Sequence, residues 1–489
     1  KKLKNNIYGF EGEINSSNKT IVIDPVPIRL WGTYYGGSGN ELPNYITSDQ
    51  NNNIYISGTT YSPNNIATVG THLTSIQNQG GFIAKFSSNG IRIWGTYYLA
   101  NTRRLKIDSN FNVYCAGASV ASTNVATVGA YQESNNGYSD AFLLKLNSNG
   151  IRDWATFFGG PSNENSFDLT FDNNNNVYMC GTTDSNTSIS TTNSHQETRD
   201  LLDDAFIVKF DENGTRLWAT YYGKEGYDAF YNCFFKDNYI YFTGRTGSTT
   251  GIATSGSYQQ NKAGNSDAMI VKFDLNGNRI WGTYLGGEGE DSFTFKSDLK
   301  NNFIYLIGPT KSTTNISTSG VLLENFQAAP NNSSSYAIIK FDIVNQTKVW
   351  GTYFNAVSGA LAVNNLNEVY FCGETISNYT EIATPDGFQP TKNSFLTVFL
   401  IKLNENGNRV WGTYYSGNSA TQNARITTDN LNNIYLYGNS NGNITGIATP
   451  NAHQLNQGSH EDTFIVKFLD CQSSASITSN SPICIGNDL

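Results

Sequence analysis

The sequence predicts an all-β fold, a seven-bladed β-propeller with four antiparallel strands in each blade. Three observations predict it. One tryptophan position recurs seven times, strand-like segments recur with it, and turn-forming residues separate those segments. No stretch shows the period of about 3.6 residues that marks an amphipathic helix. Because each repeat packs only on its neighbours, a repeat fold accommodates a chain of 489 residues as one unit.

All seven tryptophans of the chain occupy the same position of the repeat, with spacings of 63, 60, 64, 63, 69 and 61 residues. The segment around the first one reads WGTYYGG, and aromatic and threonine residues in this pattern favour a strand. A regular period of this size is typical of a solenoid, an array or a propeller. The positions are Trp31, Trp94, Trp154, Trp218, Trp281, Trp350 and Trp411.

Further segments recur between the tryptophans. One carries a tyrosine and a glycine, as at Tyr55 and Gly58, and the next carries a lysine, as at Lys85. Asn-Gly turns such as 89–90 join the lysine strand to the tryptophan strand, and Asn-Gly is a strong hairpin signal. A fourth strand, exemplified by residues 45–49, opens each repeat. Four strands in two hairpins, repeated seven times, indicate a propeller. The main alternative is an elongated β-solenoid, whose coils are usually shorter.

The order of the strands predicts how the ring closes. The first tryptophan strand, residues 29–36, precedes the other strands of the first repeat, and no tryptophan strand follows the last lysine strand, residues 463–468. An open blade edge would invite aggregation. We therefore expect residues 29–36 to complete the last blade and Trp31 to pack in the blade that contains Lys467.

The segments WGTYYGG, NIYISGTT, IATxGxYQ and DAFIVKF resemble SBBP repeats, the seven-bladed β-propeller repeats of exported bacterial proteins. The resemblance covers residues 28–470. Residues 1–27 look like an N-terminal extension, the tail of a preceding domain. Residues 471–489 look like a linker and the start of an Ig-like domain, as in surface proteins of Bacteroidetes. The resemblance implies a large, extracellular protein that is attached to the cell surface after type IX secretion.

The cysteines do not indicate a disulfide framework. Cys115, Cys180 and Cys372 occupy the same repeat segment in different copies, so we expect them to be small buried residues that do not pair. Cys471 and Cys484 follow the repeats. The resemblance implies that Cys484 pairs with a cysteine beyond residue 489, and a Cys471–Cys484 bridge is the alternative.

Charge and hydropathy exclude two classes of partner. The formal net charge is −9 and there is no basic stripe, so nucleic acid is not an expected partner. No apolar run approaches the ~20 residues that a membrane-spanning helix needs, so membrane insertion is not expected either.

The histidines do not predict a metal or catalytic site. Three of them share one repeat position that holds tyrosine, leucine or phenylalanine in the other copies, which indicates packing. His460 lies in a loop, and nothing marks it as a ligand. The three are His72, His195 and His453, and their counterparts are Tyr131, Tyr258, Leu322 and Phe388.

Aspartates precede several turns in Asp/Asn-rich runs that could suggest calcium. A calcium loop of the EF-hand type needs a glycine at its sharp turn and a distal bidentate glutamate, and neither follows these aspartates. The side chains are therefore interpreted as turn caps. They are Asp49, Asp108, Asp172, Asp237, Asp298 and Asp429.

Acidic residues follow the tryptophan strand in several copies, in loops that should share one face of the ring. Paired carboxylates there could hydrolyse glycosides, hold a cation or bind a sugar, although solvated loop charge is the commoner explanation. The candidate ligand-binding residues on this face are Glu41, Asp228, Glu290 and Asp291. The lysine of each repeat is expected to make a structural contact with an acid such as Asp140, Asp204, Asp267 or Asp462.

The sequence favours a non-catalytic extracellular module for adhesion, ligand binding or assembly, as in an adhesin. The expected partners are a surface glycan or protein and the neighbouring domains of the same polypeptide, with no cofactor. One alternative is a glycan-active hydrolase or lyase whose site lies on the acidic loop face. Another is a purely structural spacer. A fold alone does not decide among them.

Overall fold

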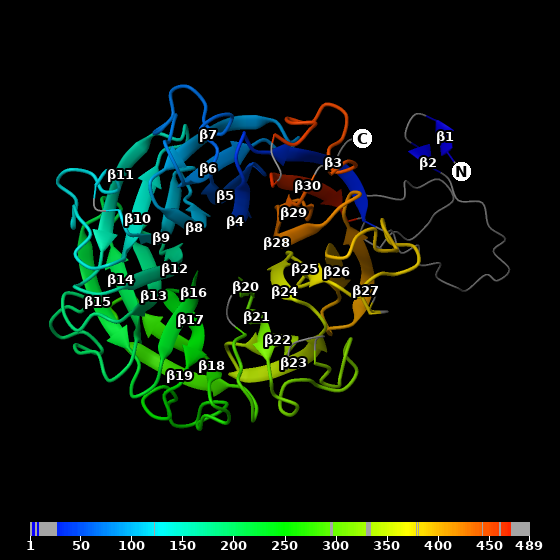
Figure 1. Cartoon of the computed structure of the whole chain (residues 1–489). Coiled ribbons are helices and arrows are strands. Elements are labelled where there is room, and N and C mark those ends of the chain that lie inside the picture. The colour runs from blue at the N-terminus through cyan, green and yellow to red at the C-terminus, as the bar shows by residue number, and fades with distance from the viewer. Residues whose placement is uncertain are drawn as a thin grey trace.

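The computed structural model is a closed ring of seven four-stranded antiparallel sheets around a central channel (Figure 1). Within each blade the strands pair in the order expected of two successive hairpins, with the inner strand at the channel and the outer strand at the rim. The predicted seven-bladed, all-β fold is confirmed.

The structure describes residues 27–121, 123–293, 297–328, 334–377, 379, 381–442, 444–458 and 461–470, and the backbone of 2–4 and 7–8. A two-stranded sheet of β1 (Lys2–Lys4) and β2 (Ile7–Tyr8) precedes the ring. The rest of the predicted N-terminal extension, except residue 27, lies outside the described residues, as do the predicted C-terminal linker, Cys471, Cys484 and His460.

The first four blades each begin with an inner strand at the channel and end with an outer strand at the rim. Blade 1 holds β4 (Glu41–Ser48), β5 (Ile54–Thr60), β6 (Gly80–Phe86) and β7 (Arg92–Tyr98). Blade 2 holds β8 (Asn101–Ile107), β9 (Val113–Ser119), β10 (Asp140–Leu146) and β11 (Arg152–Phe158). Blade 3 holds β12 (Glu164–Phe171), β13 (Val177–Thr183), β14 (Asp204–Phe210) and β15 (Arg216–Tyr222). Blade 4 holds β16 (Asp228–Lys236), β17 (Tyr239–Thr246), β18 (Asp267–Asp274) and β19 (Arg279–Leu285).

The remaining three blades have the same inner-to-outer order and include the composite one. Blade 5 holds β20 (Asp298–Lys300), β21 (Phe303–Thr310), β22 (Ser335–Asp342) and β23 (Thr347–Phe354). Blade 6 holds β24 (Ser358–Val363), β25 (Val369–Thr375), β26 (Thr397–Leu403) and β27 (Arg409–Tyr415). Blade 7 holds β28 (Thr421–Thr428), β29 (Ile434–Ser440), β30 (Thr463–Leu469) and β3 (Ile28–Tyr35).

Blade 7 closes the ring as the strand order predicts. The N-terminal strand β3 pairs antiparallel with β30, and Trp31 lies opposite Lys467 in the register. Figure 1 shows the blue β3 beside the red β30. The two ends of the propeller sequence are therefore held together by a full strand ladder. The outer edge of β30 is covered by β3.

The repeated tryptophan joins each blade to the next. Trp31 in blade 7 donates its indole N–H to the carbonyl of Ser88 in blade 1, at 3.0 Å. Its ring also covers Gly90, where a Cβ atom would lie 2.9 Å from the ring and where φ is +80°. Glycine is therefore required twice, for the turn conformation and for the room. The same indole contact reaches a carbonyl of the following blade from Trp94, Trp154, Trp218 and Trp350.

The repeated lysine lies over the ring of the repeated tyrosine in its own blade, which is a cation–π contact. Lys467 also donates to the Ser88 carbonyl that Trp31 contacts, and Lys209 lies 3.5 Å from the turn carboxylate Asp172. The expectation that these lysines contact Asp140, Asp204, Asp267 and Asp462 is wrong. Those four residues begin or immediately precede the strand, and the lysine lies near its other end.

Four of the six predicted turn caps are confirmed. Asp49 accepts the backbone N–H groups of Asn51 and Asn53, each at 2.9 Å, and Asp108, Asp172 and Asp429 do the same in their turns. Asp237 lies within a two-residue turn at φ 51°. Asp298 differs, because it begins β20 and lines the central channel, where it accepts the N–H groups of Leu299 and Val363.

The histidine and cysteine predictions are confirmed within the described residues. His453 packs edge-on against Phe86 with ring centroids 5.8 Å apart, and His72 and His195 make equivalent aromatic contacts. Burial lowers the pKa of all three histidines to about 4. Cys115, Cys180 and Cys372 are buried and form no disulfide, and the same holds for Cys233.

Asp470 replaces the missing hairpin at the seam between blades 6 and 7. Because the outer strand β3 comes from the N-terminal end, no hairpin joins it to β30. At this seam the Asp470 carboxylate accepts the indole N–H of Trp411 at 3.2 Å. The other carboxylate oxygen lies 2.7 Å from the Lys402 ammonium and accepts the Tyr370 hydroxyl. The side chains of Lys402 and Asp470 are both buried, so one carboxylate satisfies three groups that water cannot reach.

We predict that Asp470→Ala lowers the free energy of unfolding by about 1–3 kcal/mol, because it leaves buried donors without their acceptor. Urea unfolding followed by tryptophan fluorescence measures the change. Asp153→Ala is the matched control, since the Asp153 side chain is exposed on β11. An equal loss in both variants would contradict the role assigned to Asp470.

Candidate functional site

The structure does not bring the four predicted acidic residues together on an exposed face. The side chains of Glu41, Asp228 and Asp291 are fully buried at the junctions between blades. Glu290 is exposed and pairs with Lys311 at 2.6 Å. Only Glu290 of the four is therefore open to solvent at the loop face.

The buried acids hold, through hydrogen bonds, the backbone of the glycine pair that follows the tryptophan strand. The N–H of Gly37 donates to Glu41 at 3.0 Å, and the N–H of Gly36 donates to Gln454, whose amide in turn donates to Asp462. A Cβ atom on Gly36 would lie 2.4 Å from Glu41 Oε2 and 2.4 Å from Asp462 Cγ, so no larger residue fits between the two carboxyl groups. The acids are structural partners of the glycine.

The same arrangement occurs at four of the seven junctions. The triads are Gly36 with Asp462 and Glu41, Gly159 with Asp140 and Glu164, Gly223 with Asp204 and Asp228, and Gly286 with Asp267 and Asp291. At the other three junctions the glycine is replaced by Leu99, Asn355 or Ser416 and the aspartate by Gly80, Ser335 or Thr397. The glycine and the acid pair thus occur together or not at all. This pairing can be read from the sequence alone.

Burial disfavours the charged form of these carboxyl groups. It raises the pKa of Glu41 to about 7 and that of Asp228 to about 6. Burial, together with the nearby charge of Asp228, raises the pKa of Asp204 to about 7. These groups therefore take up protons near neutral pH on folding.

The functional asymmetry lies in the central channel. The inner strands place two rings of side chains there, and the strand register defines each ring. Each member of the first ring pairs, across the strand ladder, with the residue two positions after the repeated tyrosine. The members are Tyr45, Arg104, Asp168, Asn232, Ala360 and Arg425. The second ring lies opposite the tyrosine itself and comprises Thr47, Lys106, Thr170, Phe234, Asp298, Ala362 and Thr427.

One side of the first ring is a closed polar network. Arg104 of blade 2 binds Asp168 of blade 3 through two hydrogen bonds of 2.6 and 2.8 Å, and it donates to Asn232 of blade 4 at 2.6 Å. The Arg104 guanidinium also lies 4.5 Å from the centre of the Tyr45 ring. Side chains of three successive blades are thereby locked, and the charge of Arg104 is matched by Asp168.

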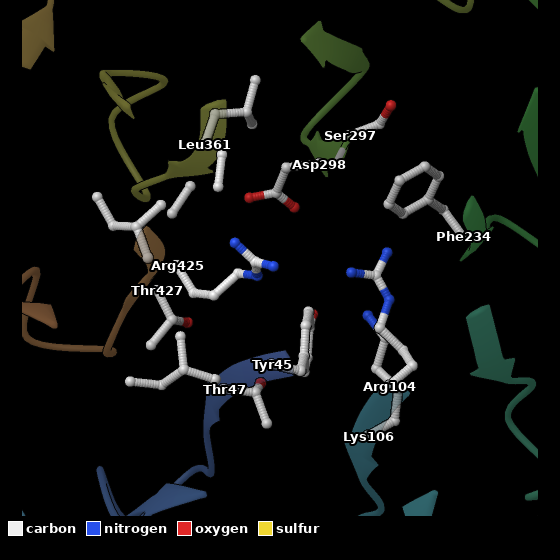
Figure 2. A pocket seen from close by; sticks show the side chains of 14 residues that line it. Tyr45, Thr47, Arg104, Lys106, Phe234, Ser297, Asp298, Leu361, Arg425 and Thr427 are labelled. Carbon is white, nitrogen blue, oxygen red and sulfur yellow. The ribbon is translucent and has the colours of Figure 1, made fainter. Parts of the chain in front are cut away.

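The other side of the channel is a cavity of about 140 Å³. Blade 6 contributes only Ala360 and Ala362 to the two rings. These small side chains leave space that larger residues fill in other blades. Arg425, Asp298 and Tyr45 line the cavity together with Lys106 (Figure 2).

Arg425 is one of two cations of this lining, with Lys106, that form no salt bridge with a carboxylate among the described residues. Its Nε donates to the carbonyl of Asn44 at 3.0 Å, and Nη1 donates to the carbonyls of Asn423 and Ala424. No salt bridge joins it to a carboxylate within the described residues, and burial lowers its pKa from the usual value. Figure 2 shows its guanidinium in the cavity between Asp298 and Tyr45.

Sequence reasoning missed these channel residues. It used residues 45–49 only to define a strand and interpreted Asp298 as a turn cap. The signal that could have found them is the contrast between positions that hardly change among the seven copies and two inner-strand positions that each hold five residue types. Which of those positions face the channel depends on the register and on a bulge in the inner strand.

Two further features are absent from the part of the chain that the structure describes. No group of three or more His, Cys, Asp or Glu side chains in this part is arranged to hold a metal ion. It also contains no helix with the length and hydropathy to cross a bilayer.

Residues 153–186 match the model of a family described as SBBP, a β-propeller repeat. The chain carries an SBBP repeat. The match agrees with the predicted repeat type, and it covers one tryptophan strand, the following inner strand and the tyrosine strand.

A curated relative is the WD repeat-containing protein L264 of Acanthamoeba polyphaga mimivirus, described as uncharacterized. It is 22% identical over 546 residues, and the alignment covers 90% of this SBBP-repeat chain and 38% of the relative. The chain thus spans well under half the length of that protein.

Two solved structures align with most of the chain at low sequence identity. The Pan2 WD40 domain of Neurospora crassa aligns with a TM-score of 0.46 and 10% identity, over 95% of this chain and all of that one. The quinohemoprotein alcohol dehydrogenase of Comamonas testosteroni aligns with a TM-score of 0.42 and 11% identity, over 93% of this chain and 78% of that one. Neither likeness bears on the ligand.

The buried carboxyl groups predict a pH-dependent stability. Because their pKa is raised in the fold, the stability they contribute is fully present at acid pH and is lost as the pH rises through about 6–7. The three histidines, whose pKa is lowered in the fold, act in the opposite direction below pH 6.5, their usual pKa. Replacing one of these acids isolates its contribution to the free energy of unfolding from that of the histidines.

We predict that Asp204→Asn is more stable than the parent chain at pH ~8, by roughly 2 kcal/mol, and that this gain shrinks at pH ~5. Asparagine can still accept the hydrogen bond that Gln196 donates to Asp204. Urea unfolding at both pH values measures the difference, with the exposed Asp153→Asn as control. A gain that does not depend on pH would contradict a raised pKa.

Proposed function

We propose that this propeller is a non-catalytic ligand-binding module of a large, secreted, cell-surface protein, serving adhesion or assembly. Its ligand site is the channel cavity. The export route proposed is type IX secretion in a bacterium of the Bacteroidetes type, and the proposal follows the resemblance to repeats of exported bacterial proteins. The neighbouring domains of the same polypeptide are further proposed partners.

One observation carries the proposal. The scaffold contacts recur around the ring, whereas each of the two channel rings holds five residue types, and a cavity opens where those residues are small. A purely structural spacer needs only the repeated contacts. A concave site lined by a few convergent polar groups is typical of ligand recognition.

The arrangement of the acids favours binding over hydrolysis. A glycosidase needs two carboxyl groups that reach the substrate from opposite sides of the bond. In this ring Glu41, Asp228 and Asp291 already accept hydrogen bonds from backbone N–H groups or hydroxyl groups at the blade junctions. In the cavity, both carboxylate oxygens of Asp298 accept backbone N–H groups.

We predict that the chain binds at least one member of a panel of glycans and monosaccharides, and that Ala362→Leu weakens this binding at least about tenfold, because leucine fills the cavity. Thr427→Leu, on the neighbouring blade 7, should act in the same direction. A glycan array followed by calorimetry measures both effects.

Ala263→Leu is the matched control, since Ala263 lies in an exposed loop at the rim. Thermal unfolding of each variant separates lost binding from lost folding. Binding that survives both cavity variants would place the ligand elsewhere. A ligand that is hydrolysed or cleaved would favour the enzyme, and no binding to any panel member would favour the spacer.

A further inference from the structure

We propose that the channel cavity binds a sugar acid of monosaccharide size, with the ligand carboxylate on Arg425 and its hydroxyl groups on the surrounding hydroxyl side chains. This inference rests on the proposed function, because it names the ligand class of the same cavity. Its grounds are the charge of the cavity and the hydrogen-bonding groups there that have no partner among the described residues.

The charges of the channel do not balance. Arg104 is matched by Asp168 through two hydrogen bonds, and the positive charge of Lys106 acts on Asp298 across the second ring. Arg425 interacts electrostatically with Glu374 but forms no salt bridge with a described carboxylate. The cavity lining holds three cations and one carboxylate, Asp298, so it favours a further negative charge, although the chain as a whole carries a net charge of −9.

Arg425 is positioned to receive that charge. Three carbonyl contacts, from Asn44, Asn423 and Ala424, fix the Nε and Nη1 side of the guanidinium. Among the described residues nothing accepts a hydrogen bond from Nη2, and this atom carries two N–H donors. Figure 2 shows the guanidinium directed into the cavity. A carboxylate there would make charge-assisted hydrogen bonds in a site partly shielded from water.

The rest of the lining suits hydroxyl groups. Tyr45, Thr47 and Thr427 line the cavity, and their hydroxyl groups make no hydrogen bond to another described residue. Each hydroxyl can donate and accept, which matches the two roles of a sugar hydroxyl. A simple inorganic anion would leave these groups unused, whereas a sugar acid engages them and Arg425 together.

Burial of an unmatched guanidinium is unfavourable, and the lowered pKa of Arg425 has the same physical cause. Without ligand, Arg425 therefore contributes little to folding stability or opposes it. With a bound carboxylate the same group becomes a favourable contact. A stabilising structural arginine would behave in the opposite way, so the two roles can be separated by experiment.

The experiment is calorimetric titration of the full chain with sodium D-glucuronate, D-glucose and sodium acetate at constant ionic strength. We expect glucuronate to bind at least about tenfold more tightly than glucose or acetate. Arg425→Gln should remove that preference for the acid without lowering the unfolding midpoint of the ligand-free protein, and Arg425→Lys should retain part of it. Arg152→Gln, at the rim, is the matched control.

Two outcomes would overturn the inference: glucose or acetate binding as tightly as glucuronate, or unchanged glucuronate binding in Arg425→Gln. A large loss of ligand-free stability in Arg425→Gln would assign the arginine to the scaffold instead. If neutral sugars bind and Ala362→Leu abolishes that binding, the proposed function stands and only the sugar-acid inference fails. If Ala362→Leu affects no probe, the proposed function itself fails.

Discussion

The ring depends on the contact between a tryptophan on one blade and a turn on the next. The indole N–H binds a turn carbonyl, and the indole ring covers the turn glycine, as Trp31 does with Ser88 and Gly90. This contact explains why the tryptophan, the Asn-Gly turn and their spacing recur together. It also explains why the N-terminal strand must complete blade 7, since Trp31 would otherwise have no strand from which to reach blade 1.

Where a scaffold element is missing, another group replaces it. At the seam between blades 6 and 7, Asp470 offers a carboxylate where other junctions offer a turn carbonyl. Three junctions lack the glycine between the carboxyl groups, and they also lack the aspartate before or at the start of the third strand. Deviations from the repeat are thus paired, which is expected when two residues share one contact.

The acids that recur and the channel residues that vary have different roles. The recurring acids are buried at blade junctions and bind backbone groups, so they stabilise the ring. The varying residues face the channel, where none of the contacts that recur from blade to blade is made. An acidic chain therefore presents a cavity whose unmatched charge, on Arg425, is positive. Overall charge alone does not predict this local charge.

The sequence by itself determined the repeat, the seven blades, the closing strand and the packing role of the histidines, because each follows from residues that recur at a fixed spacing. Only the tertiary structure decided that Glu41 is buried, that Asp298 faces the channel and that Arg425 lies across a cavity from Arg104. The physical reason is that burial and facing depend on strand register and on neighbours from other blades, hundreds of residues away along the chain.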